Sequence, residues 1–314
     1  MQYRQLGRSG LKVSVVGLGC NNFGRRLDEA ATAAVVHAAL EHGVTLFDTA
    51  DVYGSGDSER FLGRALRGRR DAAAIATKFR SAMGEGPYRQ GGSRQYIRRA
   101  VEASLRRLGT DYIDLYQMHS PDPDTPMDET LSTLDDLVHE GKVLYIGSSN
   151  FSGWQIADAD WISRVNHWVP MISAQNHYNL LHRDVEREVI RACKHFGVGM
   201  LPYFPLASGL LTGKYRRGQE PPVGSRLAGH PRADRYLNEG NFRRVEALER
   251  FASERGLTLL QVAVGGLAAQ PQVASVIAGA STPEQVSTNV QAGSWIPSAD
   301  DLAEIDRLTA SEPS

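Results

Sequence analysis

The chain has 314 residues, of which 41% are hydrophobic and 23% are charged, and its formal net charge at pH 7 is −1. This composition excludes a disordered or low-complexity chain and is typical of a folded globular protein. Because the charge is nearly balanced, we expect neither nucleic acid nor a membrane surface as a partner.

The remaining bulk features predict a cytoplasmic protein with one domain. The two cysteines, Cys20 and Cys193, lie far apart and fit no metal site, so we expect buried thiols in a reducing compartment and no bound metal. No apolar segment of the kind found in secretion signals follows the first residues. No linker interrupts the chain, which favours a single domain over residues 1–314.

In chain order, the sequence predicts a β-hairpin and then strands that alternate with helices. The hairpin comprises residues 3–6 and 12–15, around Gly7 and Gly10. Eight short apolar runs have strand character: residues 15–18, 45–48, 74–77, 113–118, 143–147, 171–174, 199–201 and 276–278. Helical periodicity covers residues 28–42, 58–66, 93–108, 127–140, 155–164, 185–196, 241–255, a further helix to about 269, 282–292 and 300–308. Ser58 is a candidate N-cap, and Gly109 and Gly197 stand where helices should end.

Eight strand–helix units with almost continuously apolar strands predict an α/β protein with a (β/α)8 TIM barrel, an N-terminal β-hairpin cap and a C-terminal helix. The competing architecture is an open doubly wound sheet, which should carry a G-x-G-x-x-G turn after its first strand. Residues 17–22 read Gly-Leu-Gly-Cys-Asn-Asn and lack the third glycine, so the barrel is favoured. Residues 204–240 are rich in glycine and proline and predict a long loop, of a length that is usually functional or mobile.

Polar residues stand at the carboxyl ends of the predicted strands or directly after them. In a parallel barrel these ends meet at one mouth, where active sites form. We therefore expect one site built from Asp48, Tyr53, Lys78, His119, Ser149, Asn150, Gln175, Tyr203 and Gly279.

Four of these residues suit proton donation to a carbonyl group. A phenol is protonated at neutral pH but is a weak acid, and a neighbouring ammonium lowers its pKa. We expect Lys78 to supply this charge to Tyr53, and Asp48 to keep Lys78 protonated. His119 would donate a hydrogen bond to the substrate oxygen.

Other uses of these residues are less well supported. A Schiff base on Lys78 requires an unpaired lysine, and Asp48 argues against that. A purely structural Asp–Lys pair remains an alternative. None of the nine histidines forms an H-x-H or H-x-x-x-H pair, which argues against metal catalysis.

The segments that carry these residues resemble the aldo-keto reductase family. Residues 46–54 (LFDTADVYG) resemble its second-strand signature, residues 76–78 (ATK) its third and residues 114–119 (DLYQMH) its fourth. Residues 147–151 (GSSNF), 175–176 (QN) and 205–215 (PLASGLLTGKY) follow in the same order, so the resemblance covers essentially the whole chain.

The resemblance implies an enzyme that reduces an aldehyde or ketone to the alcohol by hydride transfer from NAD(P)H, without a metal. Its implied catalytic residues are Asp48, Tyr53, Lys78 and His119, with Tyr53 as the general acid. The implied cofactor-binding residues are Asp48, Ser149, Asn150, Gln175, Tyr203, Leu206, Ser208, Lys214, Arg226, Gly279, Ser281, Gln285 and Asn289. The expected substrate-binding residues are Tyr53, His119 and Asn22, the last from one of the loops that shape the mouth.

The cofactor preference is open at the adenosine end. The resemblance favours NADP(H), but relatives that prefer it commonly place Arg or Lys at the positions of Gly279, Ser281 or Gln285, and none is basic here. A 2′-phosphate is best held by a guanidinium or ammonium, so NAD(H) is also possible.

Two further questions concern function. Some relatives are non-catalytic, cofactor-binding subunits that sense redox state. The complete set of four catalytic residues argues against that role here, because position 119 is a histidine and not an amide or acid.

The loops at the mouth mix polar and aromatic residues, which suits a small-molecule carbonyl substrate, either hydroxylated and sugar-like or a small aromatic aldehyde.

Overall fold

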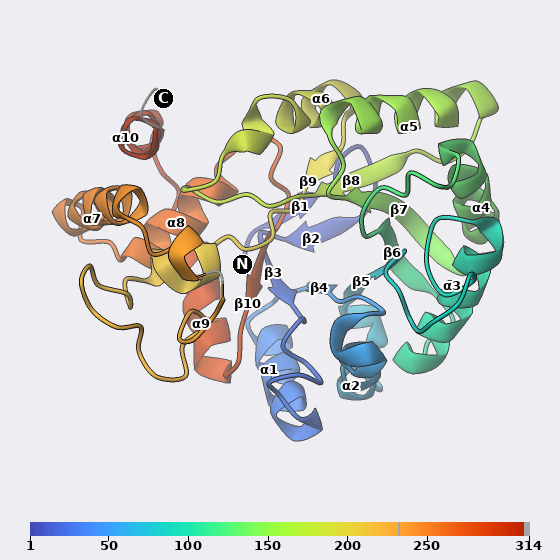
Figure 1. Ribbon diagram of the computed structural model, residues 1–314, viewed down its shortest axis with the longest axis horizontal. Coiled ribbons are helices and arrows are strands. Elements are labelled where there is room, and N and C mark those ends of the chain that lie inside the picture. The colour runs from blue at the N-terminus through green and yellow to red at the C-terminus, as the bar shows by residue number, and fades with distance from the viewer. Residues whose placement is uncertain (232, 311–314) are drawn as a thin grey trace.

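Eight parallel strands form the centre of the computed structural model, which describes residues 1–231 and 233–310 (Figure 1). Their order is β10 (Val276–Gly279), β3 (Val16–Gly19), β4 (Leu46–Asp48), β5 (Ala74–Phe79), β6 (Ile113–Met118), β7 (Val143–Ser149), β8 (Met171–Gln175) and β9 (Gly199–Met200). Backbone hydrogen bonds join β9 to the segment that leads into β10, with Met200 N to Gln272 O at 2.7 Å and Ala274 N to Met200 O at 3.0 Å. These bonds close the ring, and the predicted (β/α)8 barrel is confirmed.

Helices surround the strands in chain order (Figure 1). They are α1 (Glu29–Glu41), α2 (Asp57–Ala65), α3 (Arg94–Leu108), α4 (Met127–His139), α5 (Gly153–Asn166), α6 (Val189–Phe196), α8 (Leu259–Ala268) and α9 (Pro283–Ala292). Two more helices, α7 (Glu239–Glu254) and the C-terminal α10 (Ala299–Thr309), pack against each other beside α8. Within residues 1–231 and 233–310, no helix is both long and apolar enough to cross a membrane.

An antiparallel hairpin of β1 (Tyr3–Gln5) and β2 (Lys12–Ser14) plugs the amino-terminal end of the barrel. Leu6 and Val13 are fully buried in the cluster that fills the barrel interior. Gly7 has φ +57°, and a Cβ there would lie 2.4 Å from the carbonyl oxygen of Ile172. The hairpin backbone therefore lies directly against the strands and covers this end of the barrel.

Two local predictions were wrong. Helix α2 begins at Asp57 after Gly56, whose φ of +96° requires a glycine, so Ser58 is not the N-cap. Ser58 is instead buried inside the helix, where its hydroxyl donates to the carbonyl of Cys20 at 2.9 Å. The predicted helix over 185–196 is divided into a 3-10 turn, η3 (Asp184–Glu186), and α6.

Candidate active site

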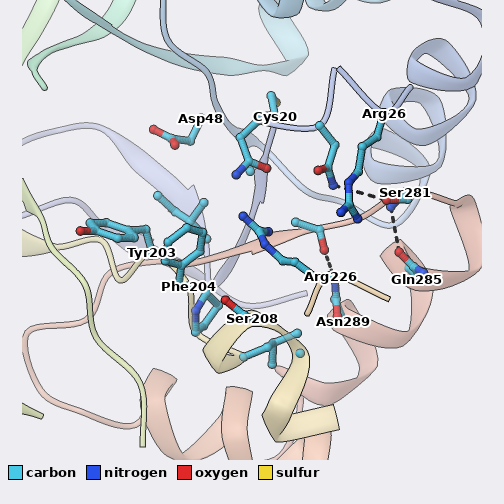
Figure 2. Close-up of a pocket in the computed structure, with 18 of the residues that line it drawn as sticks. Cys20, Arg26, Asp48, Tyr203, Phe204, Ser208, Arg226, Ser281, Gln285 and Asn289 are labelled. Atoms are coloured by element: carbon cyan, nitrogen blue, oxygen red, sulfur yellow. Dashed lines mark hydrogen bonds between the residues drawn. The ribbon is translucent and has the colours of Figure 1, made fainter. Parts of the chain in front are cut away.

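A cavity of about 890 Å³ opens at the carboxyl ends of the strands, a size that suits a large organic ligand. Its lining includes every predicted catalytic, cofactor-binding and substrate-binding residue except Lys78. Residues from seven strands or the loops that follow them therefore meet in one place, as the sequence predicted. Figure 2 shows Asp48 and Tyr203 at one end of this cavity and Ser281, Gln285 and Asn289 at the other.

A tight turn after β4 delivers Tyr53 to the cavity. Asp48 ends the strand, and the 3-10 turn η1 (Tyr53–Gly56) begins five residues later. Gly54 has φ +57° and Gly56 φ +96°, which lets the chain reverse directly into α2. Tyr53 N donates to Ala50 O at 3.2 Å, which fixes the tyrosine at the start of the turn.

Lys78 lies beneath the cavity and is fully buried. Its ammonium donates to both oxygens of Asp48, at 2.8 and 2.9 Å, and to the carbonyl of Thr49 at 2.8 Å. Burial alone would lower the pKa of Lys78, but the Asp48 carboxylate and hydrogen bonds to Asp48 and Tyr53 raise it above its ordinary value. Lys78 is therefore protonated at neutral pH, which argues against its use as a Schiff-base amine.

The effect of this cation on Tyr53 differs from our expectation. Burial raises the pKa of the Tyr53 phenol, and the positive charge of Lys78, whose Nζ lies 5.2 Å from the ring centroid, only partly offsets the rise. The net pKa is above the ordinary value rather than below it, because the loss of hydration destabilises the phenolate more than the charge of one ammonium stabilises it. Tyr53 is consequently a protonated phenol, and Lys78 makes its ionisation easier than burial alone would allow.

His119 follows β6 and faces Tyr53 edge-on, with ring centroids 5.8 Å apart and planes at 80°. Burial, followed by the charges of Lys78 and Arg80, lowers the pKa of His119 to about 3, so the imidazole is neutral at physiological pH. Ser81 Oγ lies 3.3 Å from Nδ1, while Nε2 has no hydrogen-bond partner among the described residues. A neutral donor beside a protonated phenol suits a ligand with a carbonyl oxygen.

Asn150 connects three sides of the cavity. Its φ of +60° is unusual for a residue other than glycine, and its backbone N–H donates to Gln175 O at 2.9 Å. Its side-chain amide donates to the carbonyl of His119 at 2.9 Å and accepts from the Tyr203 hydroxyl at 2.7 Å. Tyr203 stacks on His177, with centroids 5.6 Å apart and planes at 13°. The Tyr203 ring is thus fixed in orientation where it lines the cavity.

The far end of the cavity is formed by the turn between β10 and α9. Ser281 N donates to Gln285 Oε1 at 2.8 Å, and Asn289 Nδ2 donates to Gly279 O at 3.4 Å. Asn22, predicted to contact substrate, donates from its amide to Ser281 Oγ at 3.3 Å (Figure 2). Its observed contact is therefore with the end predicted for adenosine.

Sequence reasoning missed two cavity-lining cations, Arg25 and Arg26, which lie in the loop between β3 and α1. No motif marked them, because nothing in the local pattern indicates that this loop comes close to α9. The predicted cations Lys214 and Arg226 line the cavity from the long loop after β9, and the Arg226 guanidinium lies 4.8 Å from the Phe204 ring centroid.

Comparison with known proteins agrees with this geometry. The family model described as "Aldo/keto reductase family" matches residues 15–310. The chain belongs to the aldo/keto reductase family. It is similar to a rice protein named "Probable voltage-gated potassium channel subunit beta", at 38% identity over 95% of this chain and 92% of the relative. It is also similar to "L-glyceraldehyde 3-phosphate reductase" of Escherichia coli K12, at 37% identity over 99% of this chain and 93% of the relative.

A further relative is the Bacillus subtilis protein "Uncharacterized oxidoreductase YrpG", 38% identical over 93% of this chain and 91% of the relative. Family membership and these reductase relatives identify this aldo/keto reductase as an NAD(P)H-dependent oxidoreductase. Within the described residues, no group of three or more His, Cys, Asp or Glu side chains is arranged to hold a metal ion.

Proposed function

We propose that this aldo/keto reductase reduces the carbonyl group of an aldehyde or ketone to the alcohol, with Tyr53 as the general acid. One observation supports this most strongly: the Tyr53 phenol, whose raised pKa keeps it protonated, lies beside the buried, positively charged ammonium of Lys78 at one end of a cavity of about 890 Å³. A reduced nicotinamide supplies the hydride when bound.

The residues around the cavity fit such a cofactor. The cations Arg25, Arg26, Lys214 and Arg226 line it, and in the part of the chain that the structure describes none of them is paired with a carboxylate. Ser225, also in the lining, has a buried hydroxyl oxygen that finds no hydrogen-bond partner within residues 1–231 and 233–310. A phosphate group would suit the four cations and the Ser225 hydroxyl, because its oxygens carry negative charge and accept hydrogen bonds. NADP(H) is the favoured cofactor, with NAD(H) as the alternative.

The nicotinamide end would be held by Ser149, Asn150, Gln175 and Tyr203. Ser149 and Asn150 offer a hydroxyl and an amide, and the fixed ring of Tyr203 offers a flat face for stacking. Leu206, Ser208, Lys214 and Arg226 would contact the diphosphate, and Gly279, Ser281, Gln285 and Asn289 the adenosine.

The proton transfer follows from the charges beneath Tyr53. His119 would donate a hydrogen bond from its neutral ring to the carbonyl oxygen and hold that oxygen near the phenol. As negative charge develops on the oxygen, Tyr53 transfers its proton to it, and the Lys78 ammonium stabilises the phenolate that remains. Asp48 keeps Lys78 charged and in place through two hydrogen bonds.

Tyr53→Phe tests this mechanism. We expect turnover of NADPH with aldehydes to fall by about 10²–10⁴-fold, the range for loss of a general acid. NADPH affinity, measured by fluorescence titration, should stay unchanged. Tyr3→Phe is a matched control, because that tyrosine is exposed on the hairpin at the other end of the barrel. Full turnover by Tyr53→Phe would refute the role of Tyr53.

A second candidate function is a cofactor-binding subunit of a larger complex that does not turn over substrate. The rice relative and an Arabidopsis relative, each 38% identical, are named as probable channel subunits, which favours this candidate. A wild-type protein that binds NADPH tightly but consumes none with any aldehyde, ketosugar or quinone would support it. Hydroxylated aldehydes belong in that panel, because the E. coli relative is named for a glyceraldehyde phosphate.

A further inference from the structure

The loop that carries Arg25 and Arg26 is held against the far end of the cavity. The backbone N–H groups of Arg25, Arg26 and Leu27 all point to the carbonyl of Asn22, at 3.2, 2.9 and 3.0 Å. The Asn22 amide in turn donates to Ser281 Oγ at 3.3 Å, which ties this loop to the turn before α9. Arg26 and Ser281 accordingly line the same cavity, although the two residues are 255 positions apart in the sequence (Figure 2).

This end of the cavity has an excess of positive charge. Asp48 is the one acidic residue in the described lining, and it lies at the other end, bound to Lys78. Burial lowers the pKa of the Arg226 guanidinium, and the nearby charges of Arg26 and Arg25 lower it further. Helix α9 adds the positive end of its dipole, with Thr282 as its N-cap. Glu284 in its first turn is fully exposed and does not line the cavity.

Repulsion among these arginines is unfavourable unless an anion binds between them. Each guanidinium presents a planar set of donors that matches a phosphate group. Ser281 adds a hydroxyl to the same lining, held by the Asn22 amide of the arginine loop. Relatives that prefer NADP(H) commonly carry Arg or Lys at three positions of the β10–α9 turn, and the residues there in this chain, Gly279, Ser281 and Gln285, are uncharged. The loop after β3 thus places a positive charge next to a turn that lacks one.

We propose that Arg26, assisted by Arg25, binds the 2′-phosphate of NADP(H) and so makes this enzyme prefer NADP(H) to NAD(H). This inference rests on the proposed function, in which the cavity holds a nicotinamide dinucleotide. Arg226 and Lys214 come from the opposite loop and serve the diphosphate that both cofactors share. The preference therefore arises from the first βα loop and not from the turn before α9.

The test compares NADPH and NADH binding to wild-type protein and to Arg26→Gln by fluorescence titration at low ionic strength. We expect the affinity for NADPH to fall about tenfold, as for the loss of one charge-assisted phosphate contact, and the affinity for NADH to stay the same. Arg26→Lys should retain part of the preference, because it keeps the charge. Arg67→Gln, at an exposed arginine outside the cavity, is the control and should bind both cofactors as the wild type does.

Other results would overturn the proposal. Equal losses for both cofactors would place Arg26 on the diphosphate, and unchanged NADPH binding would show that Arg26 contacts no phosphate. Calorimetric titration with adenosine 2′,5′-bisphosphate and with 5′-AMP separates this inference from the proposed function. If the wild type binds the bisphosphate more tightly and Arg26→Gln removes that difference, Arg26 recognises the 2′-phosphate whether or not the enzyme turns over. If the wild type binds neither cofactor, the proposed function fails and this inference with it.

Discussion

Gln175 reaches across the barrel to Asp48: its Nε2 donates to Asp48 Oδ1 at 2.8 Å. The two residues lie on β8 and β4, and three strands separate these in either direction around the ring. The same oxygen also accepts from Lys78 at 2.8 Å and, more weakly, from Gln117 at 3.4 Å. Side chains from three other strands thus hold the carboxylate of Asp48, and Asp48 in turn holds the Lys78 ammonium beneath Tyr53. Such rigidity means that little reorganisation is needed when charge moves during the reaction.

The buried pair of Asp48 and Lys78 makes a prediction about stability. Asp48→Asn leaves a buried ammonium without its carboxylate, and we expect the free energy of unfolding to fall by about 3–5 kcal/mol. The double variant Asp48→Asn, Lys78→Met removes both charges and should be more stable than the single variant. Urea unfolding at pH 7 measures both. A double variant less stable than Asp48→Asn alone would show that the ammonium is satisfied without Asp48.

The strands and the catalytic end of the site could be predicted because each depends on local sequence. An apolar run marks a buried strand, and the polar residue that ends it must lie at the mouth of a parallel barrel, so Asp48 and His119 could be placed before the fold was known. The start of α2 could not be placed in this way. Ser58 has the right residue type for an N-cap, but the backbone conformation at Gly56 decides where the helix begins.

Two features of the site depend on contacts between distant segments, and sequence patterns do not report them. Arg26 lines the same cavity as Ser281, and a hydrogen bond from Asn22 joins its loop to that distant residue. The pKa of Tyr53 depends on a balance between burial and the charge of Lys78. How deeply Tyr53 is buried decides that balance, and burial is a property of the folded chain. The sequence indicated the correct cation but not which of the two effects is larger.

A second prediction concerns Asp51, a buried acid outside the cavity lining. Burial and the charge of Glu59 raise the pKa of Asp51 to about 7, and its Oδ1 has no hydrogen-bond partner among the described residues. Between the ordinary pKa of an aspartate and pH 7, the folded chain keeps a proton that the unfolded chain has released. Stability from this group is therefore lost as the pH rises through about 7.

Asp51→Asn should remove this loss. We expect the variant to be more stable than the wild type at pH 8.5 by a few kcal/mol, since a tenfold change in proton affinity is worth about 1.4 kcal/mol. The gain should shrink towards pH 4. Denaturant unfolding at several pH values measures it, with the exposed Asp71→Asn as a control that leaves the pH dependence as it is. An equal gain at pH 4 and pH 8.5 would contradict the assignment of the titration to Asp51.

The third prediction uses the lowered pKa of His119. A histidine that stays neutral in the folded chain down to about pH 3 does not bind the proton that the unfolded chain takes up near its ordinary pKa. Stability from this group is complete above that pKa and is lost as the pH falls from there towards 3, by up to about 1.4 kcal/mol for each pH unit. His119→Asn keeps a side-chain amide that can donate a hydrogen bond but removes the titration.

We therefore expect His119→Asn to have a shallower loss of stability between pH 6.5 and 4 than the wild type, measured by urea unfolding at each pH. His195→Asn, at an exposed histidine on α6, should keep the wild-type slope. The same argument applies to turnover: because His119 carries no charge in this range, the pH profile of kcat should show no ionisation near pH 6.5. If the kcat of the wild type did change near pH 6.5 and that change were absent in His119→Asn, the His119 imidazole would be titrating in the folded enzyme. His119 could then not be the neutral hydrogen-bond donor beside Tyr53.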